Sequence, residues 1–386
     1  MTTLRLLSAS GELSGAVLND SGGYTRPTAP LRSRVAYAAA HVVPVVWGDN
    51  TPGRPAEIDW DSTLAFRRSV YSWGLGVADA MDTAQRNMGL DAAATRELIS
   101  RSAQVAREEG GSVVVGVNTD HVLEEVISLD QVIDAYKSQL HFAEEQGAGP
   151  VLMASRHLAR VATSADDYRR VYRSVLQSAT TPVVLHWLGT AFDPALSGYF
   201  GASDWQTASS VLLEIIDENP GRVAGVKMSL LNAESEISVR ERLPQGVRMF
   251  TGDDFNYVSL IGDSDAGYSD ALLGAFAAIT PVASAAIQAL DAGDAAGYRR
   301  ILGPTEELSR QVFAAPTFYY KTGVAFLAWL NGHQPAFQMV GGLHSARSLP
   351  HLSRIVELAN ASLALEDPEL AQERWHGMLA QNGVDA

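Results

Sequence analysis

The sequence predicts an α/β protein, a (β/α)8 TIM barrel with a short N-terminal extension and a helical C-terminal extension. From about residue 35 onward, apolar runs alternate with amphipathic helical patterns, and there are eight such runs. Eight parallel strands are the number that closes this kind of barrel. The runs are nearly continuous in apolar residues, which is typical of strands covered on both faces. An open doubly wound sheet is the alternative, but no G-x-G-x-x-G loop follows any run.

The elements follow one another regularly along the chain. The runs expected to form strands are Val35–Trp47, Leu75–Met81, Ser112–Val117, Pro150–Ala154, Pro182–Trp187, Val223–Ser229, Arg248–Thr251 and Ala266–Ala275. The helical patterns between them are Trp60–Trp73, Asp91–Glu109, Ser128–Gln146, Ser164–Ser178, Ser203–Asn219, Ala233–Arg242 and Phe255–Ile261. Several of these patterns open on a residue suited to cap a helix N-terminus, such as Asp91 or Ser128.

The predicted organisation has three parts. Residues 1–34 are interrupted by glycine and proline, so we expect a small extension there, such as a hairpin. Residues 35–290 form the barrel, and residues 291–386 form a helical C-terminal subdomain. From the end of the barrel onward, helices are expected at Thr280–Asp291, Ala295–Phe313, Tyr319–Asn331, Leu349–Ala364 and Pro368–Gly383.

Composition excludes several functional classes. The net charge of −15 argues against a nucleic-acid partner, which requires a basic surface. Cysteine is absent, which excludes disulfides and thiolate chemistry. The first residues lack a secretory apolar run, and no stretch approaches the length of a membrane span. We therefore expect a cytoplasmic protein that acts without a membrane.

Lysine is scarce, and one of the few lysines lies in an unusual place. Only three of the 29 basic residues are lysines, and Lys227 stands inside the apolar run Val223–Ser229. Burial lowers the pKa of a lysine and makes it a nucleophile toward carbonyl groups. The alternative is a strand-end lysine whose ammonium reaches solvent.

Polar residues gather where the predicted strands end, which is where barrels of this type carry their working groups. Lys227 and His186 are the catalytic candidates. The candidates for substrate binding are Asp82, Thr83, Asn118, Asp120, Arg156, His157, Trp187, Ser229, Asp253, Asp254 and Tyr268. Three of the nine histidines, His121, His157 and His186, follow consecutive strands.

Several of these candidates also have a purely structural interpretation. His121 is equally consistent with a surface helix start, and Arg156 and His157 with a solvated loop. His186 lies within Val183–Trp187 and is either a core histidine or a site residue. Asp253 and Asp254 precede a predicted helix, so one could cap that helix while the other faces the site.

Two chemistries compete for these groups. An imine on Lys227 acts as an electron sink, which permits aldol cleavage or dehydration without metal or organic cofactor, with His186 as the proton carrier. The rival is a divalent metal held by histidines and carboxylates in a sugar isomerase or hydrolase. No H-x-H or H-E-x-x-H spacing supports that rival. A third hypothesis is a non-catalytic ligand-binding barrel.

Three stretches carry a resemblance to a known superfamily: Val223-Ala224-Gly225-Val226-Lys227, Thr251-Gly252-Asp253-Asp254 and Ile58-Asp59-Trp60. In this order they are similar to the strand V-x-G-I-K that carries the Schiff-base lysine, to the S-G-D-D strand and to the first helix of the dihydrodipicolinate synthase and N-acetylneuraminate lyase superfamily. The resemblance extends over residues 35–365. The resemblance implies a TIM barrel, a lyase activity through Lys227, no cofactor, and a homodimer or homotetramer.

Departures from the superfamily indicate a divergent branch with a different substrate. Its loop G-T-T-G-E grips the carboxylate of a 2-keto acid, whereas here Asp82 precedes the one remaining hydroxyl, Thr83. Its strand-5 tyrosine is replaced by His186, and a lid-like loop, Phe192–Thr207, follows. Many acids and histidines with few anion-binding groups favour a sugar-derived or keto-polyol carbonyl substrate without charge, and hence a role in carbohydrate metabolism.

Overall fold

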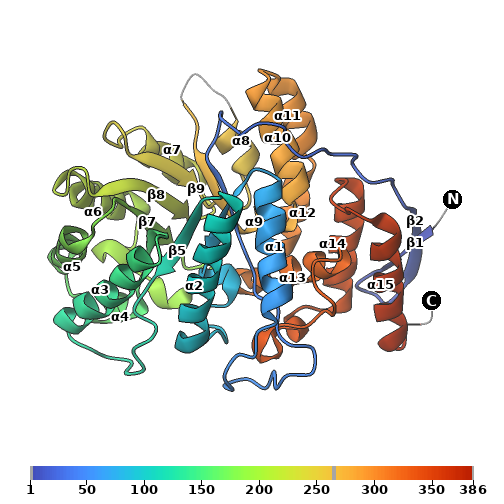
Figure 1. Ribbon diagram of the computed structural model, residues 1–386, viewed down its shortest axis with the longest axis horizontal. Coiled ribbons are helices and arrows are strands. Elements are labelled where there is room, and N and C mark those ends of the chain that lie inside the picture. The colour runs from blue at the N-terminus through green and yellow to red at the C-terminus, as the bar shows by residue number, and fades with distance from the viewer. Residues whose placement is uncertain (1–2, 263–266, 385–386) are drawn as a thin grey trace.

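The computed structural model describes residues 3–262 and 267–384. Eight parallel strands form a closed barrel in the order β10-β3-β4-β5-β6-β7-β8-β9 (Figure 1). Their bounds are β3 Ala36–Ala39, β4 Gly76–Asp79, β5 Val113–Val117, β6 Gly149–Met153, β7 Val183–Leu188, β8 Val223–Ser229, β9 Arg248–Thr251 and β10 Asp270–Leu273. The predicted (β/α)8 fold is confirmed.

Two predicted strands are shorter in the structure. The first run, Val35–Trp47, contains only the four residues of β3, because the chain leaves the barrel after Ala39. In the last run, β10 begins at Asp270, whereas Ala266 lies outside the described residues. The remaining strand predictions agree with the observed elements within a few residues.

The alternation of side chains along each strand divides the apolar residues into two layers. Inside the barrel, a compact cluster contains Ala39, Ala78, Met81, Val114, Val151, Met153, Val184, Phe250 and Leu272. The outward-facing residues join the surrounding helices in one large core. This division explains why the runs are apolar throughout, since both faces of every strand are covered.

Helices surround the barrel between consecutive strands (Figure 1). They are α1 Trp60–Ser72, α2 Ala92–Glu109, α3 Leu129–Glu145, α4 Arg156–Val161, α5 Ala165–Ser178, α6 Trp205–Asp217, α7 Ala233–Arg240, α8 Tyr257–Ile261, α9 Gly274–Ala278 and α10 Thr280–Asp291. Asp91 caps α2 by accepting from the Ala94 N–H, and Ser128 forms a capping box with Gln131. Arg156 and His157 lie in the first turn of α4, so their prediction as loop residues is wrong.

The C-terminal helices are α11 Ala295–Leu302, α12 Thr305–Val312, α13 Tyr320–Leu330, α14 Leu349–Ala361 and α15 Pro368–Gln381. The single helix expected over Ala295–Phe313 is two helices, because Pro304 cannot donate the hydrogen bond that would continue the first. The N-terminal extension is an antiparallel pair, β1 Thr3–Leu7 and β2 Leu13–Val17. It packs beside α14 and α15 (Figure 1), with the Leu7 N–H donating to Ser353 Oγ at 2.7 Å.

Among the described residues, no helix combines the length and the apolar character needed to cross a membrane.

Candidate active site

Lys227 lies near the C-terminal end of β8, on the face that points into the barrel. Because side chains alternate along a strand, Lys227 and Ser229 face inward while Val226 and Met228 join the outer core. Lys227 is 7% exposed. His186 of β7 stands beside it in register and is buried, with its Nε2 at 3.2 Å from Ser229 Oγ. The predicted amine and histidine are therefore neighbours.

Burial changes the proton affinity of Lys227 and of the acid next to it. Burial lowers the pKa of Lys227 to about 8, although the carboxyls of Asp82 and Asp254 act in the opposite direction. Burial likewise raises the pKa of Asp254 to about 8, although the Ala275 N–H donates to its Oδ1 at 2.9 Å. The amine and the acid therefore compete for a proton near neutral pH, which is useful for forming an imine.

His186 is held in the neutral form. Burial, and secondarily the charge of Lys227, lower the pKa of His186 well below its usual value. Its Nδ1 is buried and has no hydrogen-bond partner among the described residues. The neutral imidazole is the form that can accept a proton, and its lowered pKa makes it a weak base that readily gives the proton up again.

Gly252, just after β9, leaves room for the side chains of Lys227 and Ser229 to lie side by side. A Cβ atom at this position would lie 2.2 Å from Ser229 Oγ and 2.9 Å from Lys227 Cε. Any other residue would therefore displace Ser229 or Lys227.

Asp82 and Thr83 enter the site from the short 3-10 helix η1, Asp82–Ala84, which follows β4. Thr83 Oγ1 lies 2.8 Å from the hydroxyl of Tyr320, the first residue of α13. Burial raises the pKa of Asp82, and the positive charges of Lys321 and Lys227 oppose this shift. The C-terminal helices thus take part in the barrel mouth.

Lys321, next to Tyr320, is a buried lysine under the influence of Asp82 that the sequence prediction did not include. It is 2% exposed, and its Nζ donates to Met88 Sδ at 3.1 Å. Burial lowers the pKa of Lys321 to about 8, against the influence of Asp82 and Asp193. The scarcity of lysine in the sequence was the available signal, since two of the three lysines are buried here.

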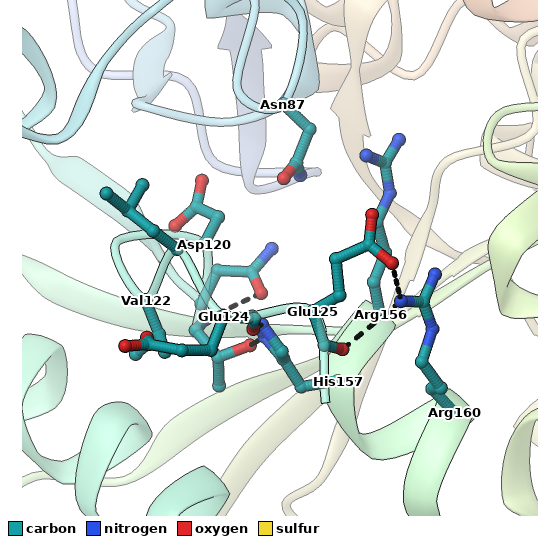
Figure 2. A pocket seen from close by; sticks show the side chains of 11 residues that line it. Asn87, Asp120, Val122, Glu124, Glu125, Arg156, His157 and Arg160 are labelled. Atoms are coloured by element: carbon teal, nitrogen blue, oxygen red, sulfur yellow. Dashed lines mark hydrogen bonds and ion pairs between the residues drawn. The ribbon is translucent and has the colours of Figure 1, made fainter. Parts of the chain in front are cut away.

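Four of the predicted residues meet in a neighbouring pocket of about 200 Å³, whose lining does not include Lys227. These are Asn118, Asp120, Arg156 and His157. Figure 2 shows the last three of them around the pocket. Asp120 is ion-paired with the buried Arg86. His157 is fully engaged, because its ring nitrogens bond to Thr119 Oγ1 at 2.8 Å and to the Glu124 carbonyl at 2.9 Å.

Three further predictions need correction. Trp187 follows His186 and therefore points out of the barrel, where its ring contacts Phe200 at 5.3 Å between centroids. Tyr268 precedes β10 and lies at its N-terminal end, with the Arg34 guanidinium 3.6 Å from its ring centroid. Neither is a mouth residue.

The third correction concerns Asp253, whose two carboxylate oxygens both hold the following segment. Its Oδ1 accepts from the Phe255 N–H at 2.9 Å, and its Oδ2 accepts from Asn256 Nδ2 at 2.9 Å. Asp253 therefore has the capping role and Asp254 faces Lys227, as the sequence interpretation allowed.

Within the described ranges, no group of three or more histidine, aspartate or glutamate side chains is arranged to hold a metal ion. The metal hypothesis thus lacks a ligand set in this part of the chain.

The fold and the site define a (β/α)8 barrel with a buried lysine on its sixth barrel strand. The family described as "Protein of unknown function (DUF993)" matches residues 4–384, and the chain belongs to this family. No curated protein matches the sequence.

Solved structures share the fold at low sequence identity. Dihydrodipicolinate synthase from Aquifex aeolicus has a TM-score of 0.63 at 14% identity, covering 86% of this chain and 100% of that chain. Dihydrodipicolinate synthase from Bacillus clausii has a TM-score of 0.63 at 13% identity, and the match covers 85% of this chain and 98% of that chain. A prophage protein of the dihydrodipicolinic acid synthase family from E. coli K12, solved with pyruvate, has a TM-score of 0.63 at 15% sequence identity. The match covers 86% of this chain and 99% of that chain. The predicted resemblance to this group of structures is confirmed.

Proposed function

We propose that the protein is a Schiff-base-forming lyase of the class I aldolase type, with Lys227 as the nucleophile. The observation that carries this proposal is a buried amine and a buried acid, Lys227 and Asp254, which influence each other electrostatically and whose pKa values both lie at about 8. A neutral amine attacks carbonyl carbons, and a protonated acid supplies the proton that the departing oxygen needs. The shared fold with dihydrodipicolinate synthases supports the same class.

The proposed reaction begins when the Lys227 amine adds to the substrate carbonyl. The oxygen takes protons and leaves as water, which gives an iminium ion. His186 then accepts the proton of a β-hydroxyl, the bond between the α and β carbons breaks, and its electrons form an enamine. Protonation of the enamine and addition of water release the second product and restore the amine. In the dehydration variant, the base takes an α proton and the β-hydroxyl leaves as water.

The proposed substrate is a small sugar-derived or keto-polyol carbonyl compound. Ser229 supplies a hydroxyl group on the same strand as the amine, and Thr83 and Tyr320 supply two more beside Asp82. Asp82 supplies an acceptor for substrate hydroxyls. A 2-keto acid is disfavoured, because its carboxylate would lie beside the carbonyl carbon and close to the carboxyls of Asp82 and Asp254.

Borohydride trapping tests this function. The protein is incubated with keto sugars and aldehydes, reduced, digested and mapped by mass spectrometry. We expect a stable adduct on Lys227, no adduct in Lys227→Met, and an unchanged adduct in Lys137→Met, which alters the one lysine outside the site.

Two outcomes contradict the proposal. One is an adduct that persists in Lys227→Met. The other is substrate turnover that is abolished by a chelator while no adduct forms with any carbonyl compound, which favours the metal-dependent alternative.

A further inference from the structure

The ammonium of Lys321 is buried with an incomplete set of partners. An ammonium has three donors, and its one hydrogen-bond acceptor among the described residues is the thioether of Met88 at 3.1 Å, which is a weak acceptor. The ammonium also lies 5.0 Å from the centroid of the Tyr320 ring. Within the described part of the chain it forms no ion pair: Asp82 and Asp193 influence it electrostatically, and the carboxylate of Asp193 is engaged by Arg156 at 2.6 Å. A buried charge is costly unless acceptors surround it, so this site lacks an oxygen ligand.

The position of Lys321 in its helix strengthens this argument. It is the second residue of α13, where the helix dipole places partial positive charge and disfavours a cation. No side chain caps this N-terminus by a hydrogen bond, although the preceding 3-10 helix η4, Thr317–Tyr319, satisfies the Tyr320 N–H through the Thr317 carbonyl. The lysine and the helix end therefore attract the same kind of group, which is an anion.

The location of the Lys321 ammonium relative to Lys227 limits the shape of the substrate. Asp82 interacts electrostatically with both lysines, whereas neither lysine is a principal influence on the other. Asp82 is therefore near both ammonium groups. A ligand that reaches both lysines passes Asp82, which repels a negative charge and accepts hydrogen bonds from hydroxyl groups.

We propose that Lys321 binds a terminal anionic group of the substrate, a carboxylate or a phosphate, separated from the reacting carbonyl by hydroxylated carbons. This inference rests on the proposed function and refines its substrate class. It replaces the uncharged substrate expected from the sequence, because that expectation did not include Lys321.

Four carbonyl probes test the inference through the rate of borohydride-dependent labelling of Lys227. They are fructose, which is neutral; 5-ketogluconate, with a distant carboxylate; fructose 6-phosphate, with a distant phosphate; and pyruvate, with an adjacent carboxylate. We expect at least one distant-anion probe to label about tenfold faster than fructose and pyruvate, the factor for one charge-assisted hydrogen bond. The two distant-anion probes distinguish carboxylate from phosphate.

Variants assign the effect to Lys321. Lys321→Met is expected to abolish the preference for the distant anion, and Lys321→Arg to retain part of it. Lys137→Met is the matched control and keeps the full preference. Equal labelling by fructose, or a preference that survives in Lys321→Met, overturns the inference.

A binding measurement separates this inference from the proposed function. Calorimetric titration of Lys227→Met with 5-ketogluconate and fructose 6-phosphate needs no imine. Binding that is lost when Lys321→Met is added supports the inference even if Lys227 never forms an adduct. The absence of binding by both probes, or binding that does not depend on Lys321, contradicts it.

Discussion

Two groups of buried charges lie in this barrel, and they differ in how completely their charges are paired. Outside the barrel wall, the Arg67 guanidinium forms two hydrogen bonds of 2.9 Å with the carboxylate of Asp79, and neither side chain is exposed. The same guanidinium donates to the carbonyls of His41 and Thr63. Every strong interaction that this cluster requires is present in the protein itself.

At the barrel mouth, the charges are equally buried but incompletely paired. Lys227 and Lys321 are 7% and 2% exposed, and among the described residues neither forms an ion pair. Burial has lowered the pKa of both lysines. We infer that the first cluster stabilises the fold, and we propose that the second keeps its donors for a ligand.

The largest predicted effect concerns the paired cluster. Asp79→Asn leaves the guanidinium of Arg67 buried without its anion, which typically costs about 3–5 kcal/mol. Urea unfolding measures this loss, while labelling of Lys227 should be unchanged in the folded variant. Glu97→Gln is the control, because its pair with Arg101 is about half exposed and contributes less than about 1 kcal/mol. If Asp79→Asn loses no more free energy of unfolding than Glu97→Gln, the stabilising role of the Arg67–Asp79 cluster is contradicted.

An intermediate effect is predicted at the barrel mouth, where the change concerns the reactivity of Lys227 and not the stability of the fold. Labelling of Lys227 should rise with pH through its pKa of about 8, because the neutral amine is the nucleophile. Asp82 raises this pKa, so Asp82→Asn should move the midpoint of the pH–rate profile to lower pH. The exposed substitution Asp217→Asn should leave the midpoint in place. A shift to higher pH would contradict the assigned electrostatics.

The smallest predicted effect concerns the contact that joins the barrel to α13. Tyr320→Phe removes the hydrogen bond to Thr83 but keeps the ring, which stacks on Phe313 at 4.4 Å between centroids. We expect a loss of about 1 kcal/mol in the free energy of unfolding. Tyr37→Phe is the matched control, because its hydroxyl bonds to Ser112 at an exposed position. A larger loss for the control would show that burial does not decide the value of these bonds.

Much of the fold could be predicted from the sequence, because buried parallel strands leave continuous apolar runs between helix signals. Lys227 and His186 could be placed together, since both occur at the ends of adjacent strands. Trp187 was misplaced although strand alternation forbids two consecutive residues from pointing inward. Tyr268 was misplaced because the apolar run extends beyond the four residues that pair in β10.

The remaining site residues depend on tertiary packing that no local pattern reveals. Phe192, in the loop after β7, packs against Phe313 and Tyr320. The next residue, Asp193, influences Lys321 electrostatically. Asp193 and Lys321 lie far apart in the sequence, so their proximity could not be predicted from spacing.

The entry of α13 into the barrel mouth has a consequence for how this protein can evolve. The amine that performs the proposed chemistry belongs to a barrel strand, whereas the proposed anion ligand belongs to a helix added after the barrel is complete. Substitutions in the first turn of that helix can change substrate preference without disturbing the reactive strand. Homologues that differ at the position of Lys321 are therefore expected to keep one reaction and accept different substrates.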